Sequence, residues 1–177
     1  MGEFRLETER LILREWREAD RDHFWEMTGD AEMMRFLLPS TREESDQAIS
    51  RQMAHQAGHG HCFWVVERKD DLRAIGYCGI IPPRAPTFEY EIGWRFVSQV
   101  WGQGLAREAA QSSLDWAWAN LDTQTVVAVT NPVNTRSWGL MLRLGMTRNP
   151  SEDFEHPDLS AGNPLRHCVL YRIKRPQ

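Results

Sequence analysis

The pattern of hydrophobic and polar positions predicts helices and strands in mixed order along the chain. Segments with apolar residues at helical spacing alternate with short segments rich in β-branched and aromatic residues, and Gly, Pro and Asp separate them. In chain order we expect helices over 18–29 and 41–56, strands over 61–68 and 73–80 forming an antiparallel hairpin, a central strand over 88–96, a helix ending near 121, a strand over 125–129, a helix over 135–144, and a polar loop over 149–164.

Several boundaries follow from local signals. Ser40 or Thr41 is expected to cap the second helix, because acidic residues follow in its first turn. In the helix that ends near 121, a buried stripe is expected at Leu114, Ala117, Trp118 and Leu121. Gly145 is expected to end the helix over 135–144 in a left-handed conformation, with Met146 packed behind it.

The central strand leads into a loop with two glycines, Gly102 and Gly104, and the loop opens directly into a helix. Such a junction concentrates backbone N–H groups without partners at a helix N-terminus, where the helix dipole favours negative charge. Glycine also lacks the Cβ atom that would keep a diphosphate from this backbone. The junction therefore predicts a site for a phosphorylated cofactor.

Two common phosphate-binding motifs do not fit this loop. A dinucleotide-binding fingerprint needs a third glycine three positions after the second, and that position is Arg107. A Walker A loop needs a lysine directly after its last glycine, and the residue there is Leu105.

The loop Trp101-Gly102-Gln103-Gly104-Leu105-Ala106 resembles the coenzyme A pyrophosphate loop of the GNAT superfamily of N-acetyltransferases. The longer segment from Glu91 to Ala109 is similar to the branch that contains the ribosomal-protein N-terminal acetyltransferases, which commonly has Trp at the position of Trp101. A second register of the motif, starting at Gln99, also fits the general pattern.

Further segments of that branch occur in the same order. The first strand of the branch is similar to Leu6 to Arg14, and its final strand to Arg166 to Arg172. Its N-x-x-S … L-G-F segment is similar to Asn134-Thr135-Arg136-Ser137 followed by Leu144-Gly145-Met146. The resemblance implies one α/β (α+β) domain over residues 1–177. Its central sheet would be mixed but mostly antiparallel, with helices on both faces and a splayed pair of central strands that admits the pantetheine arm.

Composition narrows the possible partners. At 177 residues, with a net charge of −4, the chain has no electrostatic signature of binding to nucleic acid or to an anionic membrane, and no apolar run is long enough to span a bilayer. The three separate cysteines, Cys62, Cys78 and Cys168, lack metal-ligand spacing and suggest buried, reduced thiols in a cytoplasmic protein. We expect no metal site, and a monomer and a homodimer are both compatible with the sequence.

The resemblance also implies how the cofactor is bound. Backbone groups of Trp94 and Phe96 would pair with the pantetheine amides, and the Phe96 amide would polarise the thioester carbonyl. Arg95 and Arg107 either add charge near the phosphates or are solvated surface residues. Asn134 would cap its helix and bind the pantetheine arm. The diphosphate would lie on the loop residues Trp101, Gly102, Gln103, Gly104, Leu105, Ala106 and Arg107.

Catalysis requires groups that accept and donate protons. Glu89 and Glu91 lie on one face of the central strand, where partial burial would raise the pKa of a carboxyl group. They are either structural acids that face polar loops or candidates for the base, and Glu91 is the better candidate. Many GNAT enzymes have a tyrosine as proton donor where this chain has Met141, which leaves Ser137 or a bound water for that role. His61 and His167 are expected to be structural.

The sequence thus predicts transfer of an acetyl group from acetyl-CoA, used as a co-substrate, to a primary amine within a ternary complex. The acceptor would be a protein N-terminus or a small molecule. The alternative is a module that binds acyl-CoA without catalysis, as a sensor or a structural subunit, and the missing tyrosine slightly favours it. His156 is either structural, like His61 and His167, or part of a lip of the acceptor site formed by Phe154 to Pro157.

Overall fold

The structure is a computed structural model that describes residues 3–157 and 159–177. Within these residues, nine strands form a mixed, mostly antiparallel sheet in the order β1-β2-β3-β4-β5-β6-β9-β7. The remaining strand, β8, pairs with His167 and Cys168 at the start of β9, which β6 does not contact. The strands are β1 (Arg5–Glu7), β2 (Leu11–Arg14), β3 (Phe63–Arg68), β4 (Ala74–Ile81), β5 (Glu91–Phe96), β6 (Thr125–Thr130), β7 (Thr147–Arg148), β8 (Phe154–Glu155) and β9 (His167–Lys174).

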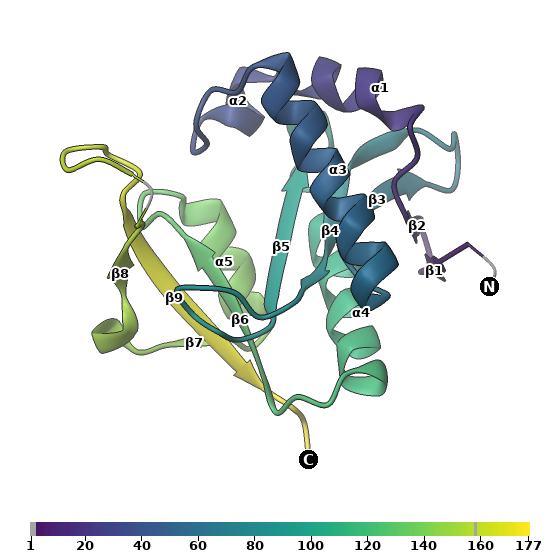
Figure 1. Ribbon diagram of the computed structural model, residues 1–177. Helices are drawn as coiled ribbons and strands as arrows, with labels where there is room; N and C mark the ends of the chain where they lie inside the picture. Colours follow the sequence, from purple (N-terminus) through teal and green to yellow (C-terminus); the bar gives the residue numbers. More distant parts are fainter. Residues whose placement is uncertain (1–2, 158) are drawn as a thin grey trace.

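Helices cover both faces of this sheet, as the sequence predicts (Figure 1). They are α1 (Asp20–Met27), α2 (Ala31–Met34), α3 (Arg42–His59), α4 (Leu105–Asn120) and α5 (Thr135–Arg143). Neighbouring residues of β4 show which helix lies on which face. Tyr77 lies beside Phe24 of α1, whereas the Cys78 thiol contacts the Ser113 hydroxyl of α4 at 3.7 Å.

Helix boundaries predicted from local signals are confirmed. Thr41 caps α3 by accepting a hydrogen bond from the Glu44 N–H (3.2 Å), and the Glu44 carboxylate accepts one from the Thr41 N–H (2.7 Å). Gly145 has a φ of 84° after the end of α5, and the Met146 N–H donates to the Met141 carbonyl at 3.0 Å. This is the Schellman arrangement, which a glycine in the left-handed region favours.

Other boundaries differ from the sequence-based expectation. The N-terminal strand is divided into β1 and β2 by a turn in which the Thr8 N–H donates to the Leu11 carbonyl (3.0 Å). The central strand begins at Glu91, because Phe88 has a φ of 53° and cannot continue an extended chain. The four-residue α2 was not predicted, because it is too short to show a helical period.

The expected loop over 149–164 contains short regular elements. A 3-10 helix (Pro150–Glu152) and β8 lie within it, and the His156 N–H donates to the carbonyl of Arg166, the residue before β9 (2.7 Å). Residue 158, which belongs to the same predicted loop, lies outside the described residues. Two-residue strands leave no alternating pattern in a sequence, so composition alone indicated a loop.

The central strands β5 and β6 are splayed. β5 pairs with β4 along its whole length, and β6 pairs in the same way with β9. Between β5 and β6, by contrast, the described residues show a single parallel pair, Glu91 with Val127. The two strands separate beyond that pair and leave a wedge-shaped gap in the sheet, as Figure 1 shows.

The core lies between the sheet and the helices. Cys62, Cys78 and Cys168 are buried and free, and burial raises the pKa of each thiol, so the cysteines are unreactive packing residues. In α4 the buried face includes Leu114 and Ala117 as expected, while Trp118 and Leu121 are only partly buried. None of the helices in the described part of the chain has the length and apolarity that crossing a membrane would require.

Candidate active site

The glycine loop has the backbone geometry of an anion site. Gly102 and Gly104 have φ values of 77° and 79°, in the left-handed region that side chains disfavour. Gly104 is the N-cap of α4, and the first helical hydrogen bond runs from the Glu108 N–H to the Gly104 carbonyl (3.1 Å). The N–H groups of the three residues before Glu108 therefore have no carbonyl partner within the helix and are available to an anion.

The space above this backbone is open. A Cβ atom at Gly102 would meet nothing within 4 Å, and one at Gly104 would meet only the Arg10 Nη2 atom, at 3.5 Å, among the described residues. A ligand can therefore approach the backbone closely from this side. The loop residues Gly102, Gln103 and Gly104 are exposed, whereas Leu105 is buried and anchors the start of α4 in the core.

An ion pair with the N-terminal segment holds the loop in place. The Glu108 carboxylate accepts hydrogen bonds from the Thr8 hydroxyl (2.6 Å), the Arg10 N–H (2.8 Å) and the Arg10 Nε (2.7 Å). Arg10 also donates through Nη1 to the Gln103 carbonyl, at 2.9 Å. The pairing with Arg10 offsets the negative charge of Glu108, which would otherwise repel an anion at the helix N-terminus. This contact of Arg10 could not be predicted from the sequence, because the two segments are far apart in the chain.

The edge of β5 that faces the gap presents free backbone groups. The Val97 N–H donates to Ile75, at the β4 side (3.0 Å), and backbone groups of successive residues point to opposite sides of a strand. The N–H groups of Trp94 and Phe96 therefore point toward the gap. The Trp101 indole N–H binds the Phe96 carbonyl at 2.8 Å, which fixes the indole at the end of this edge.

Arg95 and Arg107 were candidates for positive charge near the loop, and the structure places a third arginine, Arg136, beside it. Arg107 is exposed in the first turn of α4. Arg136, to which the sequence analysis gave no function, lies with its guanidinium 4.4 Å from the centre of the Trp101 ring. Arg95 is placed elsewhere: its guanidinium lies over Phe24 of α1, on the face opposite α4. The expectation of Arg95 as a phosphate ligand is thus not supported.

The start of α5 faces the same gap from the β6 side. The Asn134 side chain caps the helix by accepting a hydrogen bond from the Ser137 N–H (3.2 Å). This cap uses the backbone of Ser137 and leaves its hydroxyl free for another partner. Met141 is 1% exposed and packs in the core, so α5 offers no side-chain donor at that position.

Glu91 lies at the closed end of the gap, in the residue pair that joins β5 to β6. Its side chain is 17% exposed and contacts the guanidinium of Arg84 at 3.3 Å. Burial raises the pKa of the Glu91 carboxyl group, and the positive charges of Arg84 and His156 partly oppose this rise. A partly buried carboxyl group with a raised pKa beside this gap has the properties of a general base.

Glu89 has a different environment. It precedes β5, and its carboxylate forms an ion pair with Arg172 of β9 (2.6 Å) and accepts a hydrogen bond from the Thr125 hydroxyl (2.8 Å). The hydrogen bonds with Arg172 lower the pKa of Glu89. Glu89 thus holds the segment before β5 against β6 and β9 at the closed end of the gap, and a carboxylate bound in this way is a poor proton acceptor.

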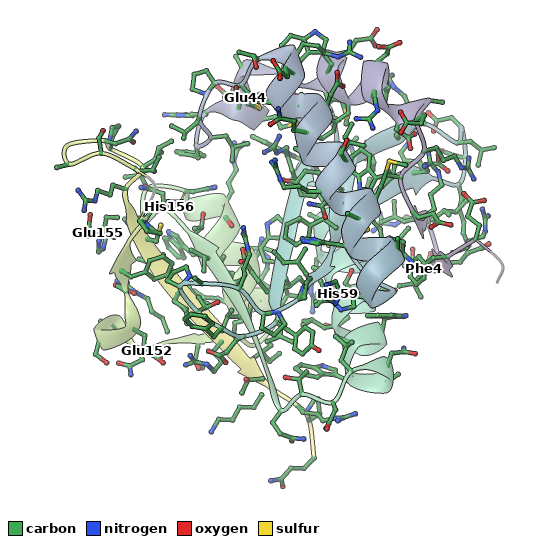
Figure 2. The ribbon with its side chains drawn as sticks, in the orientation of Figure 1. Phe4, Glu44, His59, Glu152, Glu155 and His156 are labelled. Atoms are coloured by element: carbon green, nitrogen blue, oxygen red, sulfur yellow. The ribbon has the colours of Figure 1, made fainter. Side chains whose placement is uncertain are left out.

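The histidines lie in different settings. His61 is buried, with its Nδ1 atom 2.7 Å from the Ile80 carbonyl oxygen, and His167 contacts Glu155 at 3.0 Å. Figure 2 shows Glu155 and His156 close together on the β8–β9 side of the molecule.

The sequence matches the Acetyltransferase (GNAT) domain family over residues 10–147. This match covers most of the chain, and it includes β2 to β6, the glycine loop, α4 and α5. The protein belongs to the GNAT family of acetyltransferases. Its class is therefore that of an N-acetyltransferase, for which coenzyme A thioesters are the acyl donors.

Individual relatives agree with this assignment. The chain is similar to the uncharacterized N-acetyltransferase YnaD of Bacillus subtilis, with 28% identity over 168 residues that cover 95% of each chain. It is similar in structure to an acetyltransferase from Agrobacterium tumefaciens, with a TM-score of 0.80, 25% identity, and coverage of 99% of this chain and 96% of the other.

A further solved structure shares the fold. RimL, a ribosomal L7/L12 alpha-N-protein acetyltransferase solved in complex with coenzyme A, superposes with a TM-score of 0.78 at 14% identity, and the match covers 97% of this chain and 98% of RimL. At this identity the likeness shows the fold alone.

Proposed function

We propose that the protein transfers the acetyl group of acetyl-CoA to a primary amine by direct attack within a ternary complex. The observation that carries the proposal is the gap between β5 and β6, which is bordered by a free strand edge, a helix N-terminus with unpaired N–H groups and a partly buried carboxyl group. The donor would lie along the gap, with its diphosphate on the N–H groups of Gly102 to Arg107 and its pantetheine amides on Trp94 and Phe96.

Two arginines complete the proposed donor site. Arg136, held against the Trp101 ring, supplies a positive charge beside the glycine loop from the opposite side of the gap. Arg10 borders the open space above Gly104 and fixes the loop through the Gln103 carbonyl. The Asn134 amide N–H group, which the cap does not use, is free to donate to the pantetheine arm.

When bound, acetyl-CoA supplies an acetyl group activated as a thioester. An ammonium ion has no free electron pair, so the acceptor must lose a proton before it attacks. Glu91 takes this proton, directly or through a water, because its raised pKa makes it a better base than an exposed carboxylate. The Phe96 N–H stabilises negative charge on the acetyl oxygen, and the Ser137 hydroxyl donates a proton to the departing sulfur.

Release of free thiol measures this activity. Acetyl-CoA is incubated with the protein and with a panel of primary amines, which includes amino acids, polyamines, aminoglycosides and peptides with free N-termini. We expect thiol release that depends on both acetyl-CoA and the amine, with an N-acetylated product of matching mass. A protein that binds acetyl-CoA and acetylates no amine of a broad panel would contradict the proposal.

A further inference from the structure

Three residues on one face of β5 form a row. Side chains two residues apart point to the same side of a strand, so Glu91, Gly93 and Arg95 share the face on which α1 lies. Gly93 has no side chain because the Phe63 ring occupies its place, where a Cβ atom would lie 2.6 Å from the Phe63 Cζ atom. The row thus consists of a carboxyl group and a guanidinium with an aromatic ring between them.

The aromatic surface continues from Phe63 to Arg95. The Phe63 and Tyr77 rings are stacked, with centroids 5.6 Å apart and planes at 8°. The Arg95 guanidinium lies 5.2 Å from the Tyr77 centroid and 5.8 Å from that of Phe24. Phe63, Tyr77 and Arg95 are all partly exposed, so a bound molecule can reach this surface. Two rings fix the position of the guanidinium.

The hydrogen-bonding capacity of Arg95 is largely unused. Its Nε atom is buried without a hydrogen-bond partner, and its Nη1 atom contacts the Met34 sulfur at 4.0 Å, a long and weak interaction. Within residues 3–157 and 159–177, no carboxylate forms an ion pair with Arg95. Arg14, by comparison, pairs with both Asp20 and Glu67. A half-buried guanidinium with unused donors is unfavourable unless an anion completes it.

We propose that Arg95 binds a carboxylate of the acceptor, so that the substrate of the transferase is a primary amine that carries a carboxylate. The inference rests on the proposed function. The planar fork of an arginine matches a carboxylate with two parallel hydrogen bonds. Glu91 and Arg95 are four residues apart on an extended strand, about 13 Å between Cα atoms. The carboxylate therefore lies several bonds from the amine, and the intervening part of the acceptor packs on Phe63.

Matched pairs of amines test the inference. Each pair consists of a carboxylate and its carboxamide, such as an amino acid and its amide, or tripeptides with Glu or Gln at the second position. In each pair that the wild-type protein acetylates, we expect a higher kcat/KM for the carboxylate than for the carboxamide. Arg95→Met should lower kcat/KM for the carboxylate about 10- to 100-fold, mainly through KM, and leave the carboxamide almost unchanged. Arg95→Lys should fall between the two, because lysine keeps the charge and loses the fork.

The controls separate this inference from the proposed function. Arg35→Gln removes an exposed arginine of the neighbouring α2 region that pairs with Glu32, and it should alter neither member of a pair. Calorimetric binding of acetyl-CoA shows that each variant is folded. Equal turnover of carboxylates and carboxamides by wild-type protein, or an unchanged preference in the Arg95 variants, would overturn the inference and leave the transferase activity intact. Failure of every amine to react would refute both.

Discussion

Glu89 and Glu91 are two residues apart, and their surroundings shift their pKa values in opposite directions. The ion pair with Arg172 lowers the pKa of Glu89, whereas burial raises that of Glu91. Separate environments of this kind give two carboxylates different functions. Glu91 is suited to accept a proton, and Glu89 to hold two strands together.

Replacement of each glutamate by glutamine tests this division. Glu91→Gln should lower kcat by about 10²- to 10⁴-fold, the contribution of a general base, with little change in acetyl-CoA affinity. Its unfolding temperature should stay equal or rise, because a buried charge is removed. Glu89→Gln should keep most of the kcat and lower the unfolding temperature. Steady-state kinetics and thermal unfolding measure both, and the reverse pattern would mean that Glu89 is the base.

The acidic limb of the pH profile depends on Arg84. The base works deprotonated, so kcat/KM should fall as the pH drops through the raised pKa of Glu91. The charge of Arg84 lowers this pKa, and Arg84→Ala should therefore raise it and move the acidic limb to higher pH. A limb that stays in place would show that a group other than Glu91 titrates.

At the scale of elements, the junction from β5 through the glycine loop to α4 is the proposed site of the donor diphosphate. Two local features make this junction: left-handed glycines and a helix whose first N–H groups lack partners. Both follow from neighbouring residues, which is why the sequence predicted the loop. The cap of α3 and the glycine end of α5 were predictable for the same reason.

Substitution of Gly104 tests the loop. Acetyl-CoA should raise the unfolding temperature of the wild-type protein, because a ligand that binds only the folded state stabilises it. Gly104→Val should lose most of this shift, because the side chain enters the space of the diphosphate. Gly60→Val is the matched control, since Gly60 also has a positive φ (76°) in open space, and it ends α3. Both variants should be less stable by about 1–2 kcal/mol, from backbone strain. An equal loss of the ligand-induced shift would contradict a specific function of Gly104.

Ser137 tests the proton donor at the start of α5. A thiolate is a tolerable leaving group, so Ser137→Ala should lower kcat by about tenfold to a hundredfold, less than the loss of the base. The cap of α5 uses the Ser137 backbone, so the stability should hardly change. Asn134→Ala, by contrast, should cost about 1 kcal/mol of stability and raise the KM for acetyl-CoA. Unchanged turnover in Ser137→Ala would assign the proton to water.

Contacts between distant segments explain what the sequence did not predict. Arg10 binds Glu108, Arg136 lies on Trp101, and Arg172 pairs with Glu89. No periodicity or turn signal joins such residues, so Arg10 and Arg136 received no function. The orientation of Arg95 toward Phe24 depends likewise on how α1 packs on the sheet. The longer strands and helices were predictable because each has a local pattern, whereas the short α2, β7 and β8 and the partners of the charged side chains were not.

At the scale of the whole molecule, the sheet consists of two parts that are each continuous in sequence. Strands β1 to β5 come from residues 5–96, and β6 to β9 from residues 125–174. The proposed donor site is the gap between these parts. Arg172 joins them, since it binds Glu89 before β5 as well as Glu152 after β7.

Two arginine variants separate an effect on the geometry of the gap from an effect on the stability of the whole fold. Arg14→Met breaks a buried network with Asp20 and Glu67 inside the first part, which should cost about 3–5 kcal/mol. Arg172→Met breaks the contact between the two parts. Both variants should have a lower unfolding temperature. Only Arg172→Met should raise the Kd for acetyl-CoA, which is measured by calorimetry at a temperature where both variants are folded. An equal change in Kd would show that the gap does not depend on this ion pair.

The gap has a consequence for the lifetime of the protein in a cell. A strand edge without a partner is a weak place in a sheet, and proteases attack proteins through such local openings. A donor lying along β5 would supply the missing partner and stabilise the closed form by about 2.7 kcal/mol at a concentration one hundred times its Kd. Where opening is fast compared with cleavage, degradation follows the population of the open form. The abundance of the enzyme would then rise and fall with the supply of its acetyl donor.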